Sequence, residues 1–229
     1  MCEIRLLFPV HMRTFFQDDT WQSGLEEIRV RVGQPIEFCY GSDNCYLIGK
    51  EKEQMLCSEK DYRRWEKDLY HASEADLREM LNYISNYSLY AYKEEIKQGY
   101  ITIEGGHRVG VAGQTVLVDG KIAGISPITF LNIRIAHEKC GCAKKILPLI
   151  RQKNSIYNTL ILSMPGAGKT TLLRDSIRAL SNGEAYGIRL KVCVVDERSE
   201  IAASFHGVPQ NDMGPRTDVM DGCGKAEGM

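Results

Sequence analysis

The stretch Ser163–Thr171 reads S-M-P-G-A-G-K-T-T and decides the fold class of the second half of this chain. An apolar run, Thr159–Leu162, precedes it, and a helical pattern that starts at Leu172 follows it. A strand, a glycine-rich loop, a Lys-Thr pair and a helix, in this order, form the arrangement that binds nucleotide phosphates. The sequence therefore predicts a phosphate-binding loop at this position.

The residue types in this loop suit the chemistry of a bound triphosphate. Glycines without a Cβ let consecutive backbone N–H groups point at the ligand. The ammonium of Lys169 would contact the β- and γ-phosphates, the Thr170 hydroxyl would bind Mg²⁺, and Thr171 would bond an α- or β-phosphate oxygen. The residues expected to bind nucleotide are Ser163, Met164, Pro165, Gly166, Ala167, Gly168, Lys169, Thr170 and Thr171. Ser163 replaces the first glycine of the usual G-x-x-x-x-G-K-[ST] pattern, and we expect this small residue to fit the end of the strand.

Composition limits the class of protein. The 229 residues are 43% hydrophobic, enough for one large or two small globular domains. With 29 basic and 30 acidic residues the net charge is −1, which argues against a broadly basic surface for nucleic acid. No apolar run has the length of a membrane span or of a signal-peptide core, so we expect a cytosolic protein. The 8 cysteines are scattered, with only Cys140 and Cys142 close together, which favours reduced thiols over a zinc site.

The first half of the chain has the pattern of an antiparallel sheet with helices. Glu27–Val32 alternates charged and apolar residues, as a strand with one buried face does. Ser73 is placed to cap a helix, with Asp76 three residues later. Arg108–Val118 and a return strand from Lys121 flank the hairpin signal Asp119-Gly120, and a separate strand is expected from Ile128. The tyrosines expected to serve as packing residues are Tyr83, Tyr87, Tyr90 and Tyr92.

The fold class predicted is therefore an α+β domain over residues 1–138, a connector over 139–157, and an α/β P-loop domain over 158–229. Only two clear strands follow residue 155, and the Gly- and Pro-rich tail after Ser204 contains no closing strand. Because a P-loop domain needs more parallel strands than this, we expect the domain to be incomplete at its C-terminus.

A second acidic element follows the phosphate loop. Leu190–Val195 predicts an apolar strand, and Asp196 and Glu197 stand at its carboxyl end, where α/β proteins bind ligands. A carboxylate there can hold Mg²⁺ or polarise an attacking water. The strand is either the Walker B strand or an additional acidic strand. The second reading is favoured because the strand directly follows the phosphate-loop helix, and it predicts a Walker B strand beyond residue 229.

Three motifs carry a resemblance to a known family: S-M-P-G-A-G-K-T-T-L-L-R-D at 163–175, V-V-D-E-R-S-E-I-A at 194–202, and V-P-Q-N-D-M-G-P-R-T-D-V-M-D-G-C at 208–223. Together they resemble the stage III sporulation protein AA family. That family is similar to the ring ATPases of type II and type IV secretion and of pilus retraction.

The resemblance implies a protomer with an N-terminal α+β domain and a RecA-like ATPase core, assembled as a homo-oligomer, a hexamer by analogy. It implies ATP and Mg²⁺ as ligands, while the balanced charge of the chain predicts no nucleic-acid partner. It also implies a cytoplasmic motor on the mother-cell side, peripherally bound to membrane-embedded components of a sporulation channel. The alternative is a ring scaffold that binds nucleotide without depending on hydrolysis.

The resemblance also assigns site residues. Asp196, Glu197 and Glu200 occupy the acidic positions at which the related ATPases hold the catalytic water, with Asp196 a candidate ligand of Mg²⁺ as well. Arg108 and Arg134, on separate strands of the N-terminal domain, are the candidates that reach the γ-phosphate in such rings. Since Walker B is expected outside this chain, we expect the chain as given to have little hydrolytic activity.

Overall fold

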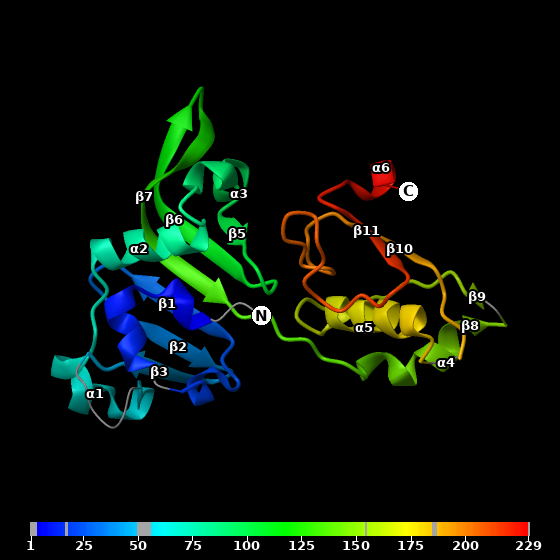
Figure 1. The fold of residues 1–229 in the computed structure, drawn as a ribbon, viewed down its shortest axis with the longest axis horizontal. Helices are drawn as coiled ribbons and strands as arrows, with labels where there is room; N and C mark the ends of the chain where they lie inside the picture. Colours follow the sequence, from blue (N-terminus) through cyan, green and yellow to red (C-terminus); the bar gives the residue numbers. More distant parts are fainter. Residues whose placement is uncertain (1–3, 17, 50–55, 154, 185–186, 229) are drawn as a thin grey trace. The chain divides into compact units, whose positions relative to one another are not determined.

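The computed structural model describes residues 4–16, 18–49, 56–153, 155–184 and 187–228. The chain divides into two compact units, Met1–Ala136 and His137–Met229, which we call unit 1 and unit 2 (Figure 1). The boundary expected from the sequence was residue 138. Residues 139–157, expected to form a connector, belong to unit 2. Cys2 lies outside the described residues.

Unit 1 is built on a seven-stranded sheet in the order β4-β3-β2-β1-β7-β6-β5, in which all neighbouring strands are antiparallel. The strands are β1 (Glu27–Arg31), β2 (Glu37–Tyr40), β3 (Asp43–Leu47), β4 (Leu56–Ser58), β5 (Tyr100–Thr102), β6 (Arg108–Val118) and β7 (Lys121–Arg134). The antiparallel sheet predicted for the first half of the chain is confirmed by these pairings.

Side-chain alternation gives this sheet one buried face. On β1, Ile28 and Val30 are fully buried, while Arg29 between them is exposed. Their neighbours Ile133 and Leu131 on β7 are buried as well, in direct register. Successive side chains of a strand point to opposite faces, so the charged residues of β1 must lie on the other face of the sheet.

The rest of unit 1 consists mainly of short helices. They are η1 (Ile4–Leu7), η2 (Val10–Phe15), η3 (Thr20–Gln22), η4 (Glu59–Asp61), α1 (Tyr62–Trp65), η5 (Glu66–Asp68), α2 (Glu74–Ile84), η6 (Leu89–Tyr92) and α3 (Lys93–Lys97). Both α2 and α3 pack against β7. The cap predicted for α2 is confirmed: the Ser73 hydroxyl accepts from the Asp76 N–H at 3.2 Å, and the Asp76 carboxylate accepts from the Ser73 N–H at 2.8 Å.

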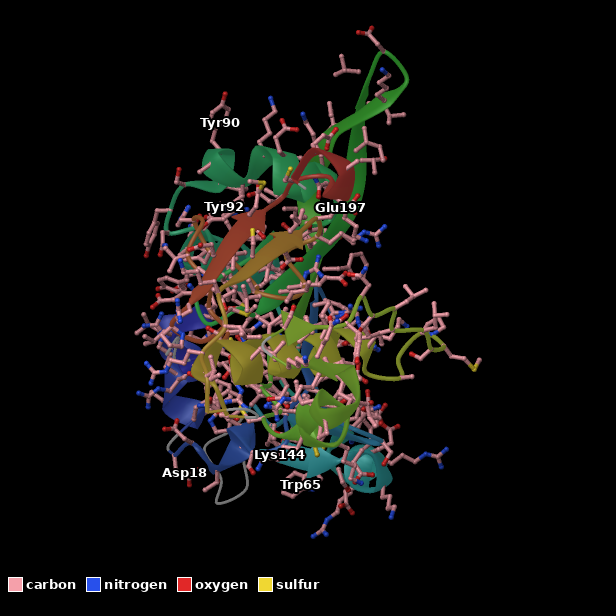
Figure 2. The ribbon with its side chains drawn as sticks, turned by 90° about the vertical axis from the view of Figure 1, so that its right-hand side faces the viewer. Asp18, Trp65, Tyr90, Tyr92, Lys144 and Glu197 are labelled. Atoms are coloured by element: carbon pink, nitrogen blue, oxygen red, sulfur yellow. The ribbon has the colours of Figure 1, made fainter. Side chains whose placement is uncertain are left out.

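Two expectations for unit 1 were wrong. The return strand from Lys121 and the strand from Ile128 are one strand, β7, which keeps its pairing to β6 through register shifts near Gly113. Of the four tyrosines expected to pack, Tyr92 is buried, but Tyr87 and Tyr90 are 72% and 84% exposed. Figure 2 shows Tyr90 pointing away from the ribbon. The reason is that α2 ends at Ile84, so its helical spacing no longer sets the direction of the later tyrosines.

Unit 2 is centred on a long helix, α5 (Lys169–Asn182). Its other elements are η7 (Cys142–Lys145), α4 (Leu147–Ile150), β8 (Arg151–Gln152), β9 (Ser155–Ile156), β10 (Val192–Asp196), β11 (Thr217–Asp221) and α6 (Lys225–Gly228). One side of α5 packs on Ala143 and Leu147, and another, through Ile177, packs on Val194 of β10. Strands β10 and β11 pair in parallel, as the α/β prediction for this part requires.

Two strand assignments in unit 2 need correction. The expected strand Thr159–Leu162 is not a strand: among the described residues none pairs with it, and Leu160 and Leu162 are 79% and 80% exposed. A strand needs a neighbour for its backbone N–H and C=O groups, and this run has none there. Conversely, no strand was singled out in the tail, which was expected to lack a closing strand, but Thr217–Asp221 forms β11.

Candidate functional site

The glycine loop leads directly into α5, as the sequence predicted. Gly168 precedes the helix with φ of 87°, and Gly166 has φ of 76°. A Cβ built on either residue would meet no atom within 4 Å, so the left-handed backbone, rather than space, selects glycine at both positions. Ser163 is not among the residues with positive φ, which explains why serine is accepted where the usual motif has glycine.

Lys169 is the first residue of α5, and its ammonium folds back over the loop. Its Nζ donates to the Ser163 carbonyl at 3.1 Å, to the Ser163 Oγ at 3.3 Å and to the Met164 carbonyl at 3.0 Å. All three acceptors are oxygens, the atoms that a phosphate would offer. The cation is therefore held at the loop, where phosphate oxygens could replace these acceptors.

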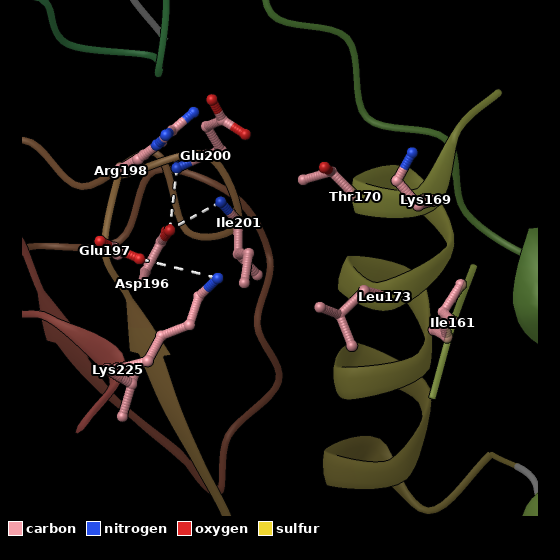
Figure 3. Close-up of a pocket in the computed structure, with 11 residues that line it drawn as sticks. Ile161, Lys169, Thr170, Leu173, Asp196, Glu197, Arg198, Glu200, Ile201 and Lys225 are labelled. Atoms are coloured by element: carbon pink, nitrogen blue, oxygen red, sulfur yellow. Dashed lines mark hydrogen bonds and ion pairs between the residues drawn. The ribbon is translucent and has the colours of Figure 1, made fainter. Parts of the chain in front are cut away.

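A cavity of about 560 Å³ lies between the start of α5 and the end of β10 (Figure 3). Lys169, Thr170 and Leu173 line it from the helix side. The residues after β10 form the opposite wall; we call residues 197–202 the acidic loop. The cavity is lined on that side and at its edges by Val195, Asp196, Glu197, Arg198, Glu200, Ile201, Lys225 and Ile161. The structure thus brings Lys169 and Thr170 together with the three acidic candidates.

Asp196 is 2% exposed, and its carboxylate is used by the backbone of the acidic loop (Figure 3). Oδ1 accepts from the Glu200 N–H at 3.0 Å, and Oδ2 accepts from the N–H groups of Ile201 and Ala202 at 2.8 and 2.9 Å. A buried carboxylate with three N–H donors is well satisfied without a metal. In this geometry the Asp196 carboxylate stabilises the conformation of the acidic loop.

Glu197 and Glu200 are the carboxylates of the acidic loop that line the cavity. The Glu197 Oε2 lies 3.7 Å from the Nζ of Lys225, and these two side chains are 47% and 72% exposed. An ion pair this open to water is weak and easily exchanged. Glu197 can therefore take part in chemistry at the cavity, and Lys225 is a residue of the cavity wall that the sequence did not indicate.

The oxygen atoms at the cavity suit Mg²⁺ in the coordination that is usual in phosphate-loop proteins. Mg²⁺ prefers oxygen ligands and usually keeps waters and substrate phosphates around one or two protein groups. The Thr170 hydroxyl and the glutamate carboxylates supply such oxygens. Within the described residues no three His, Cys, Asp or Glu side chains gather into a metal cage, which this mode of binding does not need.

Asp221 is a second carboxylate that the sequence analysis did not single out. It ends β11 in direct parallel register with Asp196 at the end of β10. Partial burial raises the pKa of Asp221, and the nearby Asp196 adds to this, while a hydrogen bond with Ser199 opposes it. The pattern T-D-V-M-D before Gly222 was the available signal, since two apolar residues lie between acids at a strand end.

The two candidate arginines lie in unit 1, whereas all residues that line the cavity belong to unit 2. Arg108 and Arg134 are direct cross-strand partners on β6 and β7. The Arg108 guanidinium lies 4.1 Å from the centroid of the Tyr100 ring, and the Nε of Arg134 lies 3.8 Å from the Glu27 Oε2. The Arg134 side chain is 71% exposed. The sheet therefore pairs two arginines that the sequence had placed only on separate strands.

Comparison with known proteins shows which family the sequence resembles. The family model described as sporulation stage III, protein AA matches residues 2–229. The stage III sporulation protein AA of Bacillus subtilis (strain 168) is 40% identical over 231 residues, which cover 100% of this chain and 68% of that protein.

Among solved structures, the X-ray structure of the Legionella pneumophila ATPase DotB matches with a TM-score of 0.48 and 18% identity. This match covers 93% of the chain and 51% of DotB, so the chain spans about half the length of that protein. Among the described residues no helix combines the length and the apolar character that a membrane crossing needs. On the family model and the Bacillus subtilis relative, the chain belongs to the sporulation stage III protein AA family.

Proposed function

We propose that the chain binds ATP with Mg²⁺ and hydrolyses it as part of a motor that drives a sporulation-specific, secretion-like channel. One observation carries this proposal: a single cavity is lined both by the Lys169-Thr170 pair of the phosphate loop and by the glutamates of the acidic loop. Phosphoryl transfer to water needs these two kinds of group on opposite sides of the γ-phosphate.

The phosphate loop would bind and orient the nucleotide. Backbone N–H groups around Gly166 and Gly168, with the N-terminal end of α5, suit the negative charge of the phosphates. Lys169 would move its three hydrogen bonds from the Ser163 and Met164 oxygens to the β- and γ-phosphates, and Thr171 would bond an α- or β-phosphate oxygen. Thr170 would hold Mg²⁺, which when bound neutralises charge on the phosphates.

The acidic loop would prepare the water. Glu197 or Glu200 would accept a hydrogen bond from the attacking water and so orient it toward the γ-phosphate. Asp196 would serve indirectly, since both of its oxygens already hold the loop backbone. Glu197 and Glu200 are therefore the two carboxylates that we propose for direct contact with the water. Asp196 would contact neither the water nor the metal.

The assembly we propose is a homo-oligomeric ring, a hexamer by analogy, in which Arg108 and Arg134 of one copy reach the γ-phosphate held by another. The ring would be cytoplasmic, on the mother-cell side, at the base of membrane-embedded sporulation components. The family's place in sporulation supports the process. The net charge of −1 supports a protein partner over nucleic acid.

ATP turnover by the protein and by Lys169→Ala tests the activity. Loss of a charge-assisted phosphate contact should reduce kcat/KM by about 30- to 1,000-fold, or roughly 2–4 kcal/mol of transition-state stabilisation. Lys144→Ala, an exposed lysine of η7 outside the cavity, is the matched control and should leave turnover unchanged. Equal turnover by the protein and by Lys169→Ala would exclude the proposed activity.

The second candidate is a ring scaffold that binds nucleotide without depending on its hydrolysis. It is favoured by Asp196, the carboxylate at the end of the apolar strand, because both of its oxygens accept hydrogen bonds from the loop backbone. Complementation of a sporulation defect separates the two. If Glu197→Gln and Glu200→Gln, alone and combined, bind ATP and still support sporulation, the scaffold function holds.

A further inference from the structure

Arg174 joins the phosphate-binding helix to the acidic loop. It lies on α5, five positions after Lys169. Its Nε donates to the Ile201 carbonyl at 2.8 Å, and its Nη2 donates to the Glu200 carbonyl at 2.8 Å. The planar guanidinium can span two adjacent carbonyls in this way, which the single ammonium of a lysine cannot do with the same geometry.

The same two residues are held from the opposite side by Asp196. The N–H groups of Glu200 and Ile201 donate to its carboxylate, while their C=O groups accept from Arg174. The Asn211 amide donates a further bond to the Ile201 carbonyl at 2.8 Å. Both polar backbone groups of Glu200 are therefore fixed by side chains from outside the loop, which restrains the position from which its carboxylate reaches the cavity.

Partial burial of the Arg174 guanidinium disfavours its charged form. Burial lowers its pKa, although the carboxylates of Glu138 and Asp196 oppose this effect. A partly buried guanidinium loses part of its hydration, and the hydrogen bonds to the two carbonyls compensate for that loss. The arrangement requires a charged, two-pronged donor at this position, and a neutral or single-pronged side chain would not reproduce it.

Helix α5 links this contact rigidly to the phosphate loop. Five positions along an α-helix span about 7.5 Å, and the hydrogen-bonded turns between them resist bending. A shift of Lys169 and Thr170 when phosphate binds would therefore move the Arg174 fork, and the backbone of Glu200 with it.

We propose that Arg174 is a positioning residue that sets where the Glu200 carboxylate stands relative to the phosphate loop. It would do so without touching nucleotide, since it is not among the residues that line the cavity. This inference rests on the proposed ATPase function.

Steady-state and binding measurements on the full chain test the proposal through Arg174→Met and Arg174→Lys. We expect kcat to fall by about 10- to 100-fold in Arg174→Met and by a smaller factor in Arg174→Lys. The Kd of a non-hydrolysable Mg-ATP analogue should change by less than about threefold, because the phosphate contacts remain. Arg151→Met, at an exposed arginine of β8, is the control for loss of a guanidinium and should leave both quantities unchanged.

A double variant separates positioning from general stability. If Arg174 acts through the Glu200 carboxylate, Arg174→Met added to Glu200→Gln should lower kcat by less than about twofold beyond Glu200→Gln alone. The proposal would be overturned if the double variant lost kcat by the product of the two single factors, or if Arg174→Met had a normal kcat.

Amide hydrogen exchange gives a readout that needs no activity. The N–H groups of Glu200, Ile201 and Ala202 should exchange at least about 10-fold faster in Arg174→Met, with α5 unchanged. Unchanged protection of these three amides would overturn the proposed restraint of the acidic loop by Arg174, even if no variant hydrolyses ATP. The two proposals also fail separately: equal turnover by the protein and Lys169→Ala excludes the ATPase, whereas Lys169-dependent turnover that Arg174→Met leaves intact excludes only the positioning role.

Discussion

Asp196 and Glu197 are adjacent in the sequence but face opposite environments. Asp196 points into the loop, is nearly inaccessible and accepts three N–H bonds. Glu197 is half exposed beside Lys225 at the cavity. The end of the strand separates them, because Asp196 is the last residue of β10 and Glu197 is the first residue of the turn that follows it. At this scale one carboxylate supports structure and its neighbour is available for chemistry.

The two carboxylates should therefore respond differently to amide substitution. Asp196→Asn replaces an acceptor by an NH₂ group that faces backbone N–H donors, so we expect the free energy of unfolding to fall by about 1–3 kcal/mol. Glu197→Gln should change it by less than about 0.5 kcal/mol, because the Lys225 pair is exposed. Urea unfolding followed by circular dichroism measures both. Equal destabilisation by the two variants would contradict the assignment of Asp196 to structure.

Asp175 is a buried carboxylate that ties the start of unit 2 to α5. Its Oδ2 accepts from the Ala143 N–H at 2.7 Å, and its Oδ1 accepts from Arg178 at 2.8 and 3.0 Å. Burial acts to raise its pKa, but the N–H groups of Ala143 and Gly141 and the Arg178 guanidinium outweigh this and hold the pKa below its usual range. The charged form of Asp175 is thus the form that the fold stabilises.

This lowered pKa fixes the sign of a pH dependence. A carboxylate whose pKa is lower in the folded than in the unfolded state contributes stability above its unfolded pKa, about 3.9 for Asp, and loses it as the pH falls further. We expect Asp175→Asn to cost roughly 1–3 kcal/mol near neutral pH and progressively less below about pH 4. Denaturant unfolding of both proteins from about pH 7 down to about pH 3 measures the difference. A difference that stays constant across this range would show that the charge is not the cause.

The ribbon formed by β6 and β7 is the element that the sequence predicted least accurately, because two strands were expected where β7 is one. Both strands are long, and their register shifts near Gly113. A Cβ on Gly113 would lie 2.1 Å from the Pro127 carbonyl oxygen and 3.0 Å from the Ile128 Cα. All of these atoms belong to the backbone of β7, so no flexible side chain can move away, and the close approach of the two strands requires glycine there.

Gly113→Ala should therefore destabilise the ribbon, by about 1–3 kcal/mol for an overpacked site. Gly124 on the facing strand offers a matched control, because a Cβ there meets no atom within 4 Å. Gly124→Ala should remain within about 0.5 kcal/mol of the parent protein. Thermal unfolding of the two variants side by side checks this, and a tolerated Gly113→Ala would mean that the strands can separate without loss.

At the scale of the whole molecule, the candidate residues are distributed over the two units. Unit 2 contains the phosphate loop and the acidic loop around one cavity, while Arg108 and Arg134 belong to unit 1. The paired arginines are held by β6 and β7, the longest strands of the sheet, which suits groups that must be presented rigidly. In the ring we propose, these arginines act on nucleotide bound to another copy.

Mixing two inactive variants tests this division. If Arg134 acts between copies, Lys169→Ala and Arg134→Ala should each have little ATP turnover, yet a mixture should regain part of it. In a randomly mixed ring with equal amounts, roughly one quarter of the interfaces combine an intact Lys169 with an intact Arg134 from the neighbour. ATP turnover measured against mixing ratio should peak near equal amounts. A mixture that never exceeds its more active component would place the arginine within the same copy or outside the reaction.

Local patterns in the sequence determined much of the fold. The alternation Glu27–Val32 predicted β1, the Ser73 and Asp76 pair predicted the start of α2, and the glycine loop predicted that a helix, α5, follows it. Each of these signals lies within a few residues, so chemistry along the chain is enough to specify it. The sequence also marked Asp196 and Glu197 as strand-end acids without distinguishing their roles.

Tertiary structure decided what depends on partners far away in the chain. Thr159–Leu162 has the composition of a strand but no strand pairs with it among the described residues, and Thr217–Asp221 is a strand because β10 lies beside it. The Asp196 carboxylate is committed to structure only because the loop turns back over it, and Arg174 reaches that loop from another element. Hydrogen bonds between distant residues have no signature in local composition, and for that reason the sequence could name the phosphate loop but not the contacts that surround it.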